Sequence, residues 1–347
     1  MRAAVFVEPG KIGLEEVPKP TIKKPTDAII KIVQTCVCGS DLWWYRGLSS
    51  RKKNSLIGHE AIGVVTELGN EVKQVKVGDF VIVPFTHGCG YCANCLAGFD
   101  GNCLNQEAGP NGGYQGEYLR YYNANWGLVK IPGKPKDYSQ EQLNSLLTLA
   151  DVMATGYHAT YSAQVQPGDT VAVVGDGAVG LCGVISAKLR GAKRIIAMSR
   201  HEDRQRLAKE FGATDIVCER GEAGVAEVMT LTNGAGVDAA LECVGTDLAI
   251  ETASQVCRAG AIVGRVGLPQ VTNLDTAKLF NNNVGLRGGI AAVTTHDRKI
   301  LLDAVLTGKI NPGKVFTKVF TLDQIQAAYE AMDKRMAIKS LVKVADC

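Results

Sequence analysis

The chain has 347 residues, of which 46% are apolar and 21% are charged, a composition typical of globular proteins with a sizeable core. Lysine and arginine number 38 against 35 aspartates and glutamates, which leaves a net charge of +3. That excess is too small for the broad basic surface that nucleic acids or anionic membranes require, so we expect neither as a partner.

The N-terminal residues predict structure rather than a targeting signal, because Met1 to Glu8 have the pattern of a strand that ends at Pro9-Gly10. The most apolar stretch, 170–188, is interrupted by Asp176 and several glycines, so we expect no membrane-spanning helix. The expected location is the cytoplasm.

Short segments rich in valine and isoleucine, separated by glycine, proline or asparagine, make up the chain as far as about residue 150. They lie at 28–33, 61–68, 79–84 and 117–122. Many short strands with turn signals between them predict an all-β barrel or sandwich.

Beyond about residue 154, strands and helices alternate. The expected strands are 170–174, 194–198, 237–242 and 261–266, and the first two are followed by helices at 178–190 and 202–211. This alternation predicts a parallel, doubly wound sheet. Two amphipathic stretches, 296–306 and 322–332, and a strand at 340–344 then either close this sheet or return to the first domain. We predict a mostly-β domain at 1–153, a doubly wound domain at 154–295 and a return segment at 296–347.

A glycine-rich motif, Gly175-Asp-Gly177-Ala178-Val179-Gly180, follows the strand at 170–174 and opens a helix. In this context the G-x-G-x-x-G pattern predicts a dinucleotide site, because the glycines permit a tight turn, close backbone approach to a pyrophosphate and close helix packing. The helix N-terminus adds free N–H groups for the phosphates. The alternative is a strand-to-helix turn that binds nothing.

The residues after the next strand favour NADP over NAD. An NAD site usually places a carboxylate there for the ribose 2′-hydroxyl, but this strand ends in Ser199 and Arg200, with Arg204 one turn later. Serine and arginine can bind a 2′-phosphate through charge-assisted hydrogen bonds. Alternatively, the two arginines are solvated charges at a helix start, with Glu202 and Asp203 as partners.

Eleven cysteines are an odd number, and four of them crowd together as Cys89, Cys92, Cys95 and Cys103. A secreted disulfide scaffold would be short and would spread its pairs along the chain. Four thiolates at these spacings can surround one zinc ion, which leaves no position for substrate and makes the site structural. A redox C-x-x-C pair or an iron–sulfur cluster are the alternatives.

Several further motifs occur in one characteristic order along nearly the whole chain. They are Cys38-Gly-Ser40-Asp41, Gly58-His59-Glu60, Gly63-x5-Gly69-x2-Val72-x5-Gly78-Asp79-x-Val81, the four-cysteine loop, and Asp151-x3-Thr155-Gly156-x-His158 before the glycine-rich motif. Together they resemble the zinc-dependent medium-chain alcohol dehydrogenases. The resemblance implies an α/β protein with a doubly wound Rossmann domain and a mostly-β, GroES-like catalytic domain.

By this resemblance Cys38, His59 and Asp151 are ligands of a catalytic zinc, with Glu60 beside them as a neighbour or alternate fourth ligand. This set of cysteine, histidine and aspartate resembles the ligand set of the bacterial NADP-dependent secondary-alcohol dehydrogenases. Cys38 could instead be one of two buried thiols with Cys36. Asp151 or Thr155 could simply cap a helix.

The resemblance also implies that Ser40 carries the alcohol proton and that Thr155 lies near the nicotinamide. It places Val266, Gly267 and Leu268 near the carboxamide, and Lys339 near the phosphates. It suggests a homodimer or homotetramer acting on a small alcohol or ketone.

One departure is Trp43, where related enzymes often have a histidine that leads protons to water. The aromatic run 43–45 either lines an apolar substrate pocket or packs in the core. Rival interpretations are a polyol or aldehyde dehydrogenase, a zinc-ribbon nucleic-acid binder, and a non-catalytic protein that binds zinc and cofactor.

Overall fold

The computed structural model describes residues 1–107, 112–270 and 274–345. The chain forms two compact units, Met1–Asp151 with Ala292–Cys347, and Val152–Ala291. The C-terminal segment therefore belongs to the same unit as the N-terminal part. Among the described helices, none is long and apolar enough to cross a bilayer.

The first unit is built on a seven-stranded sheet in the order β14-β15-β3-β4-β5-β7, with β6 also paired to β3. Its strands are β3 (Ala28–Cys36), β4 (Ala61–Leu68), β5 (Phe80–Val83), β6 (Tyr118–Tyr121), β7 (Val129–Ile131), β14 (Phe316–Thr321) and β15 (Lys339–Lys343). The hairpin of β1 (Arg2–Glu8) and β2 (Lys11–Glu16) forms a separate two-stranded sheet. Apolar and β-branched residues fill β3, which is buried along nearly its whole length, as expected of a central strand.

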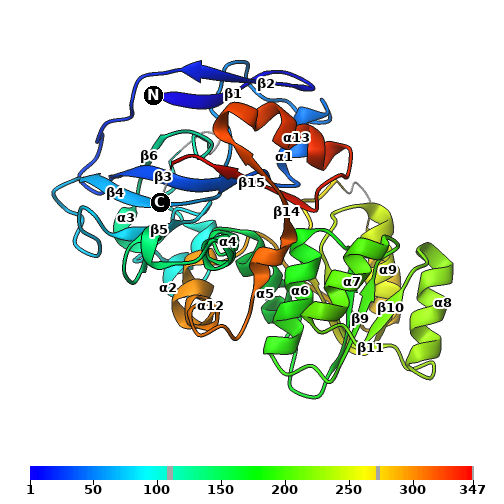
Figure 1. Ribbon diagram of the computed structural model, residues 1–347. Coiled ribbons are helices and arrows are strands. Elements are labelled where there is room, and N and C mark those ends of the chain that lie inside the picture. The colour runs from blue at the N-terminus through cyan, green and yellow to red at the C-terminus, as the bar shows by residue number, and fades with distance from the viewer. Residues whose placement is uncertain (108–111, 271–273, 346–347) are drawn as a thin grey trace. The chain divides into compact units, whose positions relative to one another are not determined.

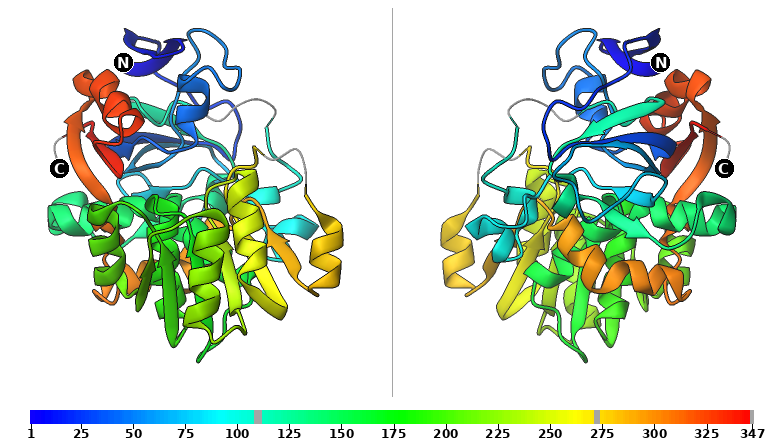
Figure 2. Two further views of the ribbon diagram at one scale, coloured as in Figure 1. Left: turned by 90° about the vertical axis from the view of Figure 1, so that its right-hand side faces the viewer. Right: turned by 90° about the vertical axis from the view of Figure 1, so that its left-hand side faces the viewer.

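Short helices connect and cover these strands. They are α1 (Asp41–Tyr45), α2 (Ala93–Leu96), α3 (Ala124–Gly127), α4 (Gln140–Thr148), α11 (Val293–His296), α12 (Leu302–Leu306) and α13 (Ile325–Asp333). The α13 helix and α1 share a core cluster with β1 that includes Phe6, Trp44 and Tyr329. Figures 1 and 2 show the red β15 beside the blue β3. The end of the chain thus completes the first sheet.

The second unit has a six-stranded parallel sheet in the order β10-β9-β8-β11-β12-β13. Its strands are β8 (Thr170–Val174), β9 (Arg194–Met198), β10 (Asp215–Val217), β11 (Val237–Glu242), β12 (Cys257–Arg265) and β13 (Gly285–Gly288). Its helices are α5 (Val152–Ser162), α6 (Ala178–Leu189), α7 (Glu202–Phe211), α8 (Gly221–Leu231), α9 (Asp247–Gln255) and α10 (Thr276–Asn281).

This strand order is that of the Rossmann fold, in which the chain reverses direction across the sheet between its first and fourth strands. The reversal lies between β8 and β11. Ligands bind such sheets at the carboxyl ends of the strands near this point. The expected fold class, which combines a doubly wound unit with a mostly-β unit, is confirmed.

Candidate functional site

Strand pairing in the first unit brings four distant segments together. The end of β3 lies beside the start of β4, with Thr35 opposite Ala61, so the residues after β3 meet those before β4. The end of β5 is next to β4, and Phe85 donates its backbone N–H to the carbonyl of Ala150. Cys38, His59, Glu60 and Asp151 converge as a result, with one ligand atom from each within 4.8 Å of the others.

Gly58 allows the chain to turn into this site. Its φ angle is +82°, and a Cβ there would lie 2.5 Å from Cγ of Gln115. The buried Gln115 cannot move aside easily, because its amide donates to the Cys36 carbonyl and accepts from the Tyr329 hydroxyl. A larger residue at position 58 would therefore displace His59.

The spacing of the donor atoms fits a tetrahedral zinc ion. Asp151 Oδ2 lies 3.5 Å from Cys38 Sγ and 3.4 Å from His59 Nε2. Ligands bound at zinc distances and tetrahedral angles stand about 3.3–3.8 Å apart. Thiolate, imidazole and carboxylate are also the donors that zinc prefers, and three of them leave a position for substrate.

Asp41 orients two of these groups. Its Oδ2 accepts the backbone N–H of Cys38 at 3.0 Å, and its Oδ1 lies 3.4 Å from Nδ1 of His59. A carboxylate on one ring nitrogen fixes the histidine tautomer, so that Nε2 is the nitrogen offered to a metal. Asp41 lies in the C-G-S-D motif, but the motif alone predicted no such role for it.

A buried ion pair borders the ligand cluster. Nζ of Lys339 lies 2.7 Å from Glu60 Oε1 and donates to the Val37 carbonyl at 3.1 Å. The second carboxylate oxygen of Glu60 is buried without a hydrogen-bond partner in the described chain. An unpaired buried oxygen is costly, and a nearby cation would relieve that cost.

The electrostatics of the cluster also suit a bound cation. Burial, reinforced by the charge of Asp151, raises the pKa of Cys38, and burial raises the pKa of Glu60. Burial alone would lower the pKa of His59, but Asp41 and Cys38 raise it. A bound divalent cation reverses this situation, because it favours the thiolate and the neutral imidazole.

Ser40 is half-buried just before α1, and its hydroxyl caps no backbone group of that helix. Of the neighbouring aromatics, Trp44 and Tyr45 are buried in the core cluster, where the Trp44 ring centroid lies 5.3 Å from that of Phe6. Only Trp43 is partly exposed. Core packing is therefore the right interpretation for Trp44 and Tyr45.

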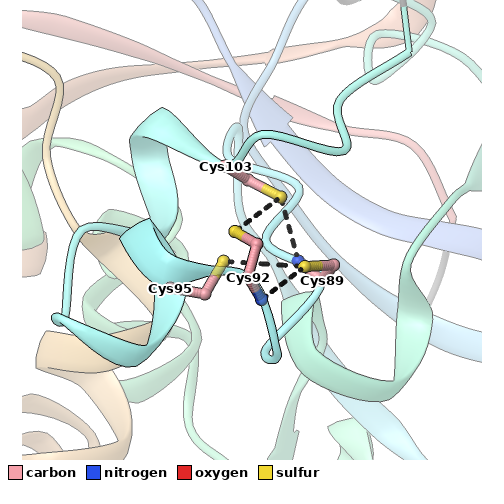
Figure 3. A group of neighbouring side chains, drawn as sticks. All are labelled: Cys89, Cys92, Cys95 and Cys103. Atoms are coloured by element: carbon pink, nitrogen blue, oxygen red, sulfur yellow. Dashed lines mark hydrogen bonds between the residues drawn. The ribbon is translucent and has the colours of Figure 1, made fainter.

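The four-cysteine loop (residues 87–106) gathers its sulfur atoms around one point (Figure 3). Cys89 Sγ is 4.0 Å from Cys95 Sγ, and Cys92 Sγ is 3.9 Å from Cys103 Sγ, too long for disulfides and close to the spacing around zinc. A backbone hydrogen bond from Leu104 lowers the pKa of Cys92 to about 6. The loop thus presents four converging thiols, one of them readily ionised.

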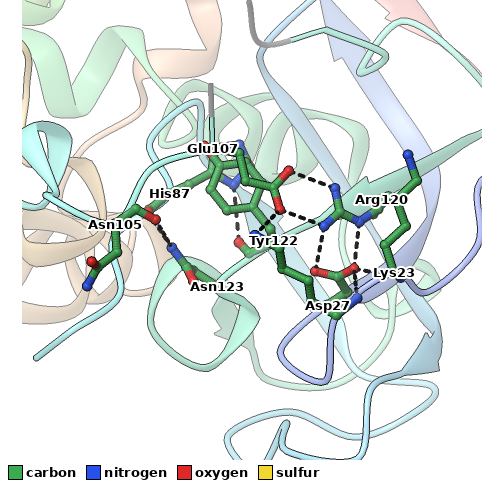
Figure 4. A network of polar contacts seen from close by, with 9 residues as sticks. Lys23, Asp27, His87, Asn105, Glu107, Arg120, Tyr122 and Asn123 are labelled. Carbon is green, nitrogen blue, oxygen red and sulfur yellow. Dashed lines mark hydrogen bonds and ion pairs between the residues drawn. The ribbon is translucent and has the colours of Figure 1, made fainter. Parts of the chain in front are cut away.

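Polar and aromatic contacts hold both ends of this loop (Figure 4). At its start, the His87 ring stacks on Tyr122 with centroids 3.9 Å apart, and burial lowers the pKa of His87 to about 4, so the ring is neutral. Beyond its end, Glu107 accepts two hydrogen bonds from Arg120, which also binds the buried Asp27. These contacts fix the loop to the sheet.

In the second unit, the glycine-rich motif forms the predicted turn between β8 and α6. A Cβ on Gly180 would lie 1.9 Å from the Gly175 carbonyl oxygen, so only glycine fits there. A Cβ on Gly177 would meet nothing within 4 Å, which leaves its backbone open to a ligand. Ala178 and Val179 start α6 and are half-buried. This turn can receive a pyrophosphate.

Other predicted cofactor residues lie at the same carboxyl edge. Val266 and Gly267 donate to the Glu242 carbonyl at the end of β11, and Leu268 is half exposed. Ser199 and Arg204 both bind Asp176 of the glycine-rich turn, whereas Arg200 is exposed. Asp176 occupies a variable position of the glycine-rich motif, so the sequence alone predicted no role for it.

For two residues that were predicted to contact the cofactor, the hydrogen bonds and ion pairs of the structure do not test the prediction. Thr155 is buried in α5 of the second unit, near the close approach of Gly156 to α6. Lys339 is occupied by Glu60 and Val37, and its predicted contact with phosphates stays a prediction.

Comparisons with known proteins agree with this architecture. Residues 24–133 match the model of the alcohol dehydrogenase GroES-like domain, and residues 178–306 match that of the zinc-binding dehydrogenases. A zinc-type alcohol dehydrogenase-like protein of Bacillus subtilis is 31% identical, covering 99% of this chain and 100% of its own. The NADP-dependent isopropanol dehydrogenase of Thermoanaerobacter brockii is 32% identical over 99% of this chain and 98% of its own.

Among solved structures, the alcohol dehydrogenase of Thermus sp. ATN1 superposes with a TM-score of 0.90 at 30% identity, covering 99% of this chain and 100% of that one. Similarity of this extent spans both units and both clusters of ligand residues. With its mostly-β GroES-like unit, its Rossmann unit and its two converging sets of metal-binding side chains, the chain belongs to the zinc-dependent alcohol dehydrogenases.

Proposed function

We propose that the protein interconverts secondary alcohols with ketones, and also alcohols with aldehydes, using zinc and NADP(H). The observation that carries this proposal is the convergence of Cys38, His59, Glu60 and Asp151 within 4.8 Å. A thiol, an imidazole and carboxylates at this separation have little structural purpose without a cation. With an exchangeable position they suit catalysis.

Cys38, His59 and Asp151 would hold the catalytic zinc, and Glu60 is the alternate ligand. Zinc bound there would supply the positive charge that lowers the pKa of an alcohol hydroxyl toward neutrality. Asp41 holds His59 in the tautomer suited to this task. Lys339 compensates the charge of Glu60 and holds its carboxylate at the edge of the cluster.

Ser40 is the proposed proton acceptor. Its hydroxyl is not used in capping α1, so Oγ is available to accept the alcohol proton and to pass it outward. Because position 43 is a tryptophan, which cannot pass a proton to water as a histidine does, the alcohol proton must leave Ser40 by another route. The partly exposed Trp43 favours apolar substituents on the substrate.

NADP would supply the redox chemistry, and the chain's part is to bind and orient it. Gly175, Gly177, Ala178, Val179 and Gly180 form the phosphate turn. Ser199, Arg200 and Arg204 are the proposed contacts of the 2′-phosphate. Toward the nicotinamide end of the cofactor, Thr155 would contact the ring, and Val266, Gly267 and Leu268 would contact its carboxamide.

Two facts support NADP. The tip of β9 carries Ser199 and Arg200 rather than a carboxylate, and a relative of 32% identity is named as NADP-dependent. The four-cysteine loop would hold a second, structural zinc. We also propose a cytoplasmic homodimer or homotetramer, in line with the sequence resemblance.

The test is a panel of secondary alcohols, ketones, polyols and aldehydes, assayed with NADP(H) and NAD(H) by absorbance. We expect the highest kcat/KM for a secondary alcohol or its ketone with the phosphorylated cofactor. His59→Ala should abolish turnover while NADP still binds, and Arg200→Ala should weaken NADP binding more than NAD binding. Turnover that persists in His59→Ala would contradict the role of zinc in catalysis. Equal losses of affinity for both cofactors in Arg200→Ala would contradict the contact of Arg200 with the 2′-phosphate.

A further inference from the structure

The carboxylate of Asp176 reaches from the glycine-rich turn to the tip of β9. Its Oδ2 accepts a hydrogen bond from the Ser199 hydroxyl at 2.9 Å. Its Oδ1 accepts one from Nη1 of Arg204, also at 2.9 Å. All three residues belong to the second unit, so the contact lies within one compact body.

This carboxylate stands where a Rossmann fold recognises the adenosine ribose. In such folds the pyrophosphate lies on the glycine-rich turn, and the group that recognises the 2′ position follows the second strand. The second strand here is β9, and Ser199 is its next residue. Asp176 belongs to the glycine-rich turn and binds Ser199, so its side chain links the pyrophosphate turn to the residue after the second strand. A carboxylate thus lies beside the residue that follows the second strand, although it belongs to a different segment.

The three side chains form a closed and largely buried set. Ser199 is 4% exposed, and the side chains of Asp176 and Arg204 are 10% and 15% exposed. A serine hydroxyl has one proton to donate, and here it is donated to Asp176. A 2′-phosphate must therefore draw the Ser199 hydroxyl away from Asp176 before this hydroxyl can bind it, whereas Arg204 has further N–H groups beyond the one that Asp176 uses. The phosphate also brings two negative charges close to a third.

Arg200 is the group that favours the phosphate without such competition. It is exposed and forms no ion pair among the residues that the structure describes. The 2′-hydroxyl of NAD, in contrast, can donate to Asp176 directly, as it does to the acid of an ordinary NAD site. The end of β9 and the glycine-rich turn thus offer one attraction for each cofactor.

We infer that Asp176 is the residue that sets cofactor preference, by accepting the ribose hydroxyl of NAD and repelling the 2′-phosphate of NADP. This inference rests on the proposed use of a nicotinamide dinucleotide. It specifies an enzyme that accepts both cofactors, in which NADP is favoured only modestly because Asp176 opposes Arg200 and Arg204.

Asp176→Asn tests the inference, because asparagine keeps the shape and one acceptor oxygen but removes the charge. Isothermal titration of the zinc-loaded full chain with NADP⁺ and with NAD⁺ gives both Kd values without turnover. We expect the ratio of Kd for NAD⁺ to Kd for NADP⁺ to rise about tenfold, which corresponds to about 1.4 kcal/mol of lost repulsion.

Asp203→Asn is the matched control. Asp203 is an exposed acid one residue before Arg204, and its removal changes the net charge equally without touching the Asp176 contacts. The control should leave the ratio unchanged. An equal rise in both variants would overturn the inference, because it would assign the effect to overall charge.

An unchanged ratio in Asp176→Asn, or an equal loss of both cofactors, would also overturn the inference while leaving the proposed function intact. If the wild type bound neither cofactor, the proposed function would fail together with it. Should Asp176→Asn not fold, as judged by circular dichroism, the wild-type ratio decides. A ratio below about tenfold supports the role of Asp176, and a larger one contradicts it.

Discussion

Nζ of Lys339 lies 2.7 Å from Oε1 of Glu60, and both side chains are only 1% exposed. The two residues are 279 positions apart in the sequence and meet because β15 pairs with β3 next to the start of β4. Burial alone would lower the pKa of Lys339, but Cys36 and Glu60 raise it, so the lysine keeps its charge. This pair ties the C-terminal strand to the proposed zinc ligands.

Lys339→Met should destabilise the protein strongly, because it leaves the buried Glu60 without its partner. Removing one member of a buried ion pair costs about 3–5 kcal/mol. Glu60→Gln combined with Lys339→Met should recover part of that loss. Denaturant unfolding of the zinc-loaded single and double variants measures it. Losses that simply add in the double variant would contradict the coupling.

Cys92→Ser should remove the structural zinc but leave cofactor binding intact. Three remaining thiols make a weaker site, and the loop loses the ion that holds it together, so the melting temperature should fall by several degrees. Metal analysis should give one zinc per chain fewer than in the wild type. Cys218→Ser, which changes an exposed cysteine of the second unit, is the control and should alter neither value.

Iron in the wild-type protein would instead support a cluster of iron and sulfur. Unchanged zinc content in Cys92→Ser would show that the four thiols do not share an ion.

Glu107→Gln should make stability less dependent on pH in the acid range. The hydrogen bonds from Arg120 lower the pKa of Glu107 to about 2, so its charge stabilises the fold above its usual pKa and loses this effect as the pH falls toward 2. We expect a loss of about 1–2 kcal/mol at pH 7, discounted for partial exposure, that shrinks below about pH 4.5.

Denaturant unfolding between pH 7 and about pH 2.5 measures this difference, because the charge effect is lost between the usual pKa of glutamate and about 2. Glu71→Gln changes an exposed glutamate that forms no ion pair in the described part of the chain, and it should show no such trend. A loss in Glu107→Gln that stays constant with pH would contradict the assignment to the charge.

Local patterns were sufficient for most of the fold. The alternation of 170–174, a glycine-rich turn and a helix identified β8, the turn and α6, because these signals act between neighbours in the sequence. The spacing of Cys89, Cys92, Cys95 and Cys103 was equally local, and the sulfurs do converge. For Cys38, His59 and Asp151, only resemblance to a family suggested a meeting, since no spacing rule joins segments so far apart.

What the sequence could not provide depends on tertiary contacts. Trp44 packs against Phe6 and Trp43 stays partly exposed because only one side of α1 faces the core. The sequence could not predict which side, since five helical residues are too few to show a clear hydrophobic periodicity. The partnership of Asp176 with Ser199 and Arg204 needs the lateral pairing of β8 with β9. Side chains brought together by sheet register leave no mark on either segment alone.

The central claim is that Cys38, His59 and Asp151 bind one zinc ion. Anomalous diffraction from crystals of the zinc-loaded protein, recorded on both sides of the zinc absorption edge, tests it most directly. We expect one anomalous peak among the four cysteines and a second about 2.0–2.3 Å from Cys38 Sγ, His59 Nε2 and an Asp151 oxygen. A fully loaded crystal with a peak only in the four-cysteine loop would contradict the claim.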